Sequence, residues 1–274
     1  MTIKIRNRIY LFLAVSGAFF LAVYTALFIY GAINNLLQPP ENLIRPSNFF
    51  KFNFNAVFAS IFFSGAASPA IAYFVFRGFS KTSSLEILFF TGVVISGMAE
   101  ETRLLIPVLN LWQSSSTLTI FIGRAGVVAK LLVSLSILFS SLFSSSEQLE
   151  NAERNLFFLF AISCAFGFFY PINSNQISST CTVTYGMGFL FETIRVLILI
   201  TTIITTLINS NPGGTFKENL HCYGKCLGIV LFFTGNIILQ ICDSVPLLIL
   251  GIAVYSLGCF LYLKEMHYMA NNWS

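Results

Sequence analysis

Long apolar stretches recur along the whole chain and constrain its fold more than any other feature. The first covers residues 9–33, and the last runs for 38 residues, from 226 to 263. As one helix the last stretch would be about 57 Å long, roughly twice the hydrocarbon core of a bilayer. It contains Asp243-Ser-Val-Pro246, a sequence that favours a turn followed by the start of a new helix. We therefore expect it to fold back on itself as a helical hairpin.

These stretches predict an all-α fold, a polytopic bundle of eight transmembrane helices that forms one integral membrane domain over residues 1–274. Seven spans is the alternative, because the stretch at 155–171 is short enough to be re-entrant. The predicted spans are residues 9–33, 54–76, 85–112, 117–143, 155–171, 184–208, 226–241 and 246–263.

The composition supports a membrane protein and excludes several other classes. Hydrophobic residues make up 56% of the chain and charged residues only 9%, whereas about a quarter of a soluble domain is charged. A water-soluble enzyme, a disordered protein and a nucleic-acid-binding domain are incompatible with these proportions. The expected partner is the lipid bilayer, with other membrane subunits as a further option, and no motif points to a cofactor.

The distribution of basic residues predicts the orientation in the membrane. Lys4, Arg6 and Arg8 precede the first apolar stretch, which is too long for the core of a cleaved signal peptide, so we read it as a retained helix. With eight spans and the N-terminus inside, the inner segments hold nine Lys and Arg residues and the outer ones only Arg45 and Lys51. The positive-inside rule then places both termini in the cytoplasm, in a multi-pass protein of the plasma membrane.

Seven charged residues interrupt the predicted spans beyond their first turn and form the candidate site. Charged side chains at bilayer depth are costly and are rarely tolerated without a partner or a function. Counted along their helices, the charges come from three different spans, and all fall in the outer half of the membrane. They are Glu100, Glu101, Arg103, Arg124, Lys130, Glu192 and Arg195.

Two interpretations of this cluster remain open. Glu100–Arg103 and Glu192–Arg195 are i, i+3 pairs, which lie on one helical face. With three acids and four bases, the cluster has the composition of a site that binds or transports a small polar or anionic solute. The alternative is a structural or assembly subunit in which the ion pairs only fix helix packing.

Two further readings rank lower. One is a membrane sensor without its own output domain. The other is an intramembrane enzyme, which the supply of catalytic residues disfavours: the chain has two histidines and a single aspartate, Asp243.

The cysteines give two weaker hypotheses. His221, Cys222 and Cys226 lie at one predicted helix start on the cytoplasmic side, and with His267 they match a Cys2His2 zinc set, although reduced cytosolic thiols explain them equally simply. Cys181 and Cys242 are the two cysteines predicted to face outward. A disulfide between them is the other hypothesis, with free thiols as its alternative.

Overall fold

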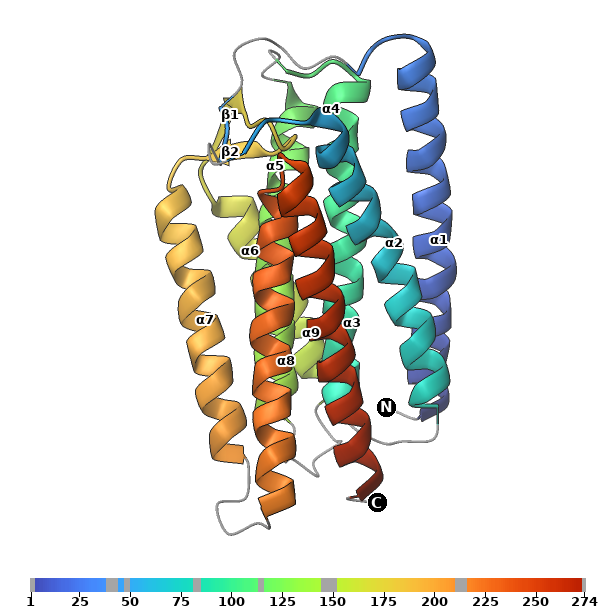
Figure 1. Ribbon diagram of the computed structural model, residues 1–274, viewed down its shortest axis with the longest axis vertical. Helices are drawn as coiled ribbons and strands as arrows, with labels where there is room; N and C mark the ends of the chain where they lie inside the picture. Colours follow the sequence, from blue (N-terminus) through green and yellow to red (C-terminus); the bar gives the residue numbers. More distant parts are fainter. Residues whose placement is uncertain are drawn as a thin grey trace.

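The chain folds into a bundle of long helices with a small two-stranded sheet at one end (Figure 1). The computed structural model describes residues 3–37, 44–46, 50–80, 85–112, 116–143, 152–209 and 216–272. Its helices are α1 (Ile3–Ile33), α2 (Phe54–Gly78), α3 (Leu85–Glu100), the 3-10 helix η1 (Glu101–Leu104), α4 (Leu105–Val108), α5 (Thr117–Leu142), α6 (Ala152–Phe169), α7 (Gly188–Asn209), α8 (Phe216–Gln240) and α9 (Val245–Asn272).

Six of these helices, α1, α2, α5, α7, α8 and α9, are long and apolar enough to cross a membrane. The predicted helical membrane bundle is therefore confirmed in outline.

The predicted third span is one rod made of three pieces, since α3 passes through η1 into α4 without leaving the bundle. Two helix starts are capped locally: Asn53 accepts a hydrogen bond from the Asn55 amide, and Ser116 from the Thr119 amide.

The last apolar stretch folds back as predicted. Helices α8 and α9 run side by side as an antiparallel pair and connect at the end of the bundle that carries the sheet (Figure 1). Glycines permit this close packing: a Cβ atom at Gly235 or Gly258 would collide with the backbone of the opposite helix. Small residues serve this purpose in membrane helix pairs because they let the two backbones approach.

Both termini lie at one end of the bundle, opposite the sheet (Figure 1). Helices α3 and α8 begin at the end of the bundle that carries the two termini and finish at the end that carries the sheet, whereas α7 begins at the sheet end. The last turn of α3, the first turns of α7 and the last turn of α8 are therefore brought to the same depth. This is the region where the sequence places its membrane charges.

The sheet end shows one difference from the predicted spans. The span expected at 184–208 begins later, at Gly188, because β2 (Val183–Tyr185) pairs antiparallel with β1 (Ile172–Ile177). Alternating Thr and bulky side chains over residues 182–185 favour a strand over a helix. The hairpin is tied down by a hydrogen bond of 2.9 Å from the Ser179 amide to the carbonyl of Ile44.

Candidate functional site

The candidate site is built around a break in the third helical rod. After Glu100 the α-helix tightens into the 3-10 turn Glu101–Leu104, which carries Arg103. A 3-10 segment within a longer helix often marks a functional position or local strain, because its hydrogen bonds are poorer than those of an α-helix. Here the turn aims Glu100 and Arg103 into the bundle, where both are buried.

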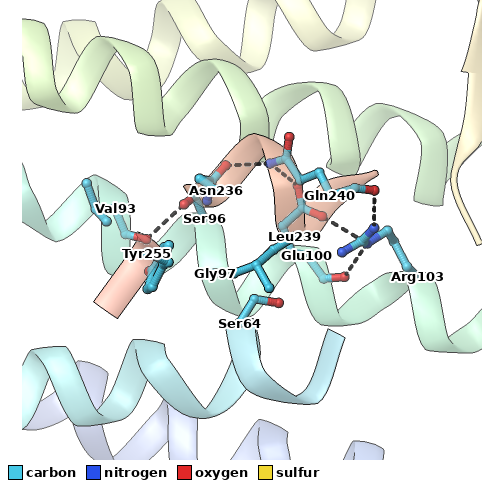
Figure 2. A pocket seen from close by; sticks show the side chains of 10 residues that line it. All are labelled: Ser64, Val93, Ser96, Gly97, Glu100, Arg103, Asn236, Leu239, Gln240 and Tyr255. Atoms are coloured by element: carbon cyan, nitrogen blue, oxygen red, sulfur yellow. Dashed lines mark hydrogen bonds and ion pairs between the residues drawn. The ribbon is translucent and has the colours of Figure 1, made fainter. Parts of the chain in front are cut away.

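Glu100 and Arg103 form a buried ion pair, with 2.9 Å between Nε of Arg103 and Oε2 of Glu100. Both side chains also form hydrogen bonds with α8, and Arg103 reaches the loop between β1 and β2. Gln240 donates to Oε1 of Glu100 at 3.2 Å, and Nη1 of Arg103 donates to the carbonyls of Gln240 at 3.4 Å and Thr180 at 3.5 Å. Side chains from α3 and α8 thus hold one another at this depth (Figure 2).

A small cavity adjoins the pair and lies between α2, α3, α8 and α9 (Figure 2). Its free space matches roughly one water molecule. The amides Asn236 and Gln240 face it, joined by a hydrogen bond of 2.7 Å. Its lining is polar on one side and apolar on the other: Ser64, Val93, Ser96, Gly97, Glu100, Arg103, Asn236, Leu239, Gln240 and Tyr255.

The second predicted pair, on α7, is asymmetric. Nη1 of Arg195 lies 2.9 Å from Oε2 of Glu192, but the arginine side chain is only 1% exposed whereas the glutamate is 46% exposed. The guanidinium packs 5.3 Å from the ring centroid of Phe233 on α8. Its Nε and Nη2 atoms have no hydrogen-bond partner among the described residues. Arg195 therefore presents two unused donors to the interior of the bundle.

Lys130 on α5 links the two pairs electrostatically. It interacts with Glu100, Arg103, Glu192 and Arg195, and its ammonium lies 5.0 Å from the ring centroid of Tyr185 on β2. We call these five charged residues the central cluster. Three cations and two carboxylates leave it with a net charge of one positive unit.

The other two predicted residues lie outside the central cluster. Arg124 stacks on Phe168 of α6, 4.4 Å from its ring centroid. Glu101 points from η1 toward α2, where it packs against Gly65. Adjacent residues of a helix do not share a face, so Glu100 and Glu101 enter different environments although they are neighbours in the chain.

Sequence reasoning missed a second buried ion pair, at the end of the bundle that carries the termini. Lys225 on α8 donates to Glu86 on α3 at 2.9 Å, and both side chains are buried. The expectation that buried charge is confined to the outer half is thus wrong. Glu86 lies inside the predicted span 85–112 and was available as a signal. Lys225 gave no such signal, because the predicted span 226–241 begins after it, whereas α8 begins at Phe216.

The weak zinc set is not assembled in the described part of the chain. Nδ1 of His221 lies 2.6 Å from Glu265, and the Cys222 thiol contacts the carbonyl of Thr206. His267 packs instead against Phe79 on another helix, and Cys226 is buried. Among the described residues no three metal-ligating side chains form a group.

The predicted disulfide is not formed in the structure. Cys181 and Cys242 are both buried free thiols. They lie at the same end of the bundle, as expected, but no disulfide joins them. Cys181 lies in the β1–β2 loop, outside the membrane helices, with a positive φ of 56°. Burial raises the pKa of its thiol to about 12. The Cys242 thiol contacts the carbonyls of Ala56 and Ser244.

No protein-family description matches the chain, and no curated protein or solved structure is significantly similar to it.

Proposed function

We propose that this is a multi-pass membrane protein whose central cluster binds a small anionic solute in the outer half of the bilayer and transports it. The observation that carries the proposal is Arg195, a fully buried guanidinium with two nitrogen atoms unpartnered among the described residues. Buried donors are nearly always satisfied in folded proteins, so an unused pair calls for an explanation. An anion that accepts from both nitrogens supplies one, because guanidinium binds oxyanions with two parallel hydrogen bonds.

The charge of the central cluster supports an anion rather than a cation. Its net positive unit is enclosed by apolar helices, where attraction to a negative ligand is screened less than in water. Lys130 interacts electrostatically with Arg195 and meets the face of Tyr185, which supports the proposal that the two cations act on the same ligand.

The proposed orientation has eight passes, both termini in the cytoplasm and the plasma membrane as the location. Two observations support it: the chain ends lie together at one end of the bundle, and nine of the basic residues fall on that side in an eight-span reading against two on the other. The central cluster then faces the outer leaflet.

A structural or assembly role is the second candidate, and one observation favours it. Glu100, Arg103 and Gln240 already bond to one another, and the adjoining cavity has space for about one water molecule. A network of this kind would fix the register of α3 against α8 without any ligand.

Ligand-dependent thermal stability separates the two candidates. The purified protein in lipid nanodiscs is heated with sodium sulfate, phosphate, acetate or glutamate at constant ionic strength, with chloride as the reference. A bound anion at one hundred times its Kd would stabilise the fold by about 2.7 kcal/mol. We expect one anion to raise the melting temperature of the wild type and of Arg124→Gln, but not of Arg195→Gln. Equal melting temperatures in all salts would favour the structural role.

Access from water gives an independent test. Ser96 lines the cavity, so the variant Ser96→Cys places a thiol beside the central cluster. A charged, membrane-impermeant methanethiosulfonate added to the outside of intact cells should modify this thiol, and the proposed anion should slow the reaction. If the reagent failed to modify the introduced thiol even in the absence of any anion, the result would count against a water-accessible site.

A further inference from the structure

Glu101 is a buried carboxyl group that no side chain of the described residues neutralises. The residue is 1% exposed, and neither of its oxygen atoms has a hydrogen-bond partner among the described residues. The adjacent Glu100 differs in this respect, because it is paired with Arg103 and accepts from Gln240. Two glutamates that follow one another in the chain therefore occupy opposite electrostatic situations.

The carboxyl group of Glu101 occupies a recess in α2. A Cβ atom at Gly65 would collide with Oε1, Cδ and Cγ of Glu101, so the missing side chain of Gly65 makes the space that the carboxyl fills. The recess lies in the small-residue segment Ser64-Gly-Ala-Ala-Ser68, which offers little polar surface beyond two serine hydroxyls. Those hydroxyls already donate to carbonyl groups of α2 itself.

The basic groups on the elements around η1 are directed elsewhere, and one tyrosine interacts with Glu101. On α1, Tyr24 is the titratable residue that interacts electrostatically with Glu101. On α5, Lys130 interacts with members of the central cluster, and Arg124 stacks on Phe168 of α6. On the rod itself, Arg103 is paired with Glu100. In the described part of the chain, no cation forms an ion pair with Glu101.

We propose that Glu101 is a proton-binding site, which holds its carboxyl as the neutral acid in the folded membrane protein. An ionised carboxylate buried without a counterion or hydrogen bonds is strongly unfavourable, and such a group takes up a proton instead. The ligand is a single proton, and protonation removes the charge that the recess cannot compensate. The site is distinct from the central cluster, and the proposal does not depend on an anion binding there.

Infrared spectroscopy of the full chain in lipid nanodiscs tests the protonation state directly. The measurement is made at about pH 6, where the carboxyl of a free glutamate is almost entirely ionised. Glu100→Gln is the matched control, because it removes the same residue type one position away. We expect Glu101→Gln to abolish a carboxylic-acid C=O band of the wild type, and Glu100→Gln to retain that band and lose carboxylate absorption. If Glu101→Gln instead lost carboxylate absorption and kept the carboxylic-acid band, the proposal would be overturned.

Chemical labelling of the wild type provides a second measurement that needs no variant to fold. Dicyclohexylcarbodiimide enters membranes and adds across a protonated carboxyl, which gives up its proton to the reagent and becomes a stable N-acylurea. Peptide mass spectrometry after treatment at about pH 6, where free glutamate is ionised, should find the adduct on Glu101 and not on Glu100. An adduct on Glu100 with none on Glu101 would contradict the proposed site.

The stability of Glu101→Gln adds a third check. Glutamine has the shape and neutrality of a protonated glutamate, so the variant Glu101→Gln should have the same melting temperature as the wild type. The comparison is made at about pH 6, because below that pH a free glutamate side chain also begins to bind protons. If Glu101 were instead an anion held by an ion pair, the same substitution would lower the melting temperature and refute the proposal.

Discussion

Lys225 on α8 and Glu86 on α3 form a buried ion pair across 2.9 Å, although 139 positions separate them in the chain. The pair ties the start of α3 to α8 toward the end of the bundle that carries the termini, while Glu100 and Gln240 tie the same helices near the sheet. Helices α3 and α8 are thus joined by polar side chains at both ends, with apolar packing between.

Removal of Lys225 should destabilise the bundle. Lys225→Met leaves the Glu86 carboxylate buried without its partner, and we expect a loss of about 3–5 kcal/mol in the free energy of unfolding. The double variant Glu86→Gln with Lys225→Met should recover most of this loss. Lys264→Met, at an exposed position of α9, is the control. Unfolding in lipid–detergent mixtures measures the effect, and equal stability of Lys225→Met and Lys264→Met would show that the pair is unimportant.

The pair on α7 should respond unequally to removal of its two partners. Glu192→Gln strands a fully buried guanidinium and is expected to cost about 3–5 kcal/mol. Arg195→Gln leaves a glutamate that is nearly half exposed, so its cost should be about 1 kcal/mol or less. Thermal unfolding of the two single variants measures the difference. A larger loss for Arg195→Gln would mean that Glu192 is the residue that depends on the pair.

A methyl group added at the α8–α9 contact should disturb the hairpin. In Gly235→Ala the new Cβ meets the backbone of Tyr255, which cannot move aside as a side chain can. We expect a loss of about 1–3 kcal/mol from overpacking. Gly188→Ala is the matched control, since nothing lies within 4 Å of its Cβ position. Melting temperatures that fall equally in both variants would exclude a specific clash.

The thiol of Cys181 should be unreactive in the folded protein even at alkaline pH. The thiolate is the reactive form, and burial raises the pKa of this group to about 12. At about pH 9 an ordinary cysteine, with a pKa near 8.5, is mostly thiolate, so a cysteine introduced at the exposed residue Asn175 should be alkylated quickly. Mass spectrometry after iodoacetamide treatment compares the two sites. Equal alkylation rates would show that Cys181 is open to solvent. Alkylation of Cys181 only after treatment with a reductant would indicate a disulfide.

The central cluster was accessible to sequence reasoning because charge is conspicuous in an apolar helix. Its five members are among the seven charged residues that the sequence analysis singled out, and Lys130 interacts electrostatically with the other four. Depth does not specify the direction in which a side chain points, however. Arg124 and Glu101 belong to the same set of charged residues, yet they face α6 and α2 because of the rotation of their helices.

The neutral members of the site gave no comparable signal. Asn236 and Gln240 reduce the hydropathy of α8 only slightly, so they are inconspicuous until α8 is seen opposite α3. The strand at Val183–Tyr185 was likewise hidden, because its apolar residues extend the stretch that becomes α7. A strand of three residues is stabilised by its partner strand rather than by its own composition.

The sequence by itself determined, in outline, that the chain is a helical membrane bundle, and it showed most of the charges that interrupt the apolar stretches, because the cost of polar groups in hydrocarbon is a property of each segment alone. Only the tertiary structure decided which charges meet. It paired Glu86 with Lys225, left Glu101 in the recess of Gly65, and kept Cys181 and Cys242 as separate thiols. Those outcomes depend on how the helices rotate about their axes and how closely they pack, and both are set by contacts between residues far apart in the chain.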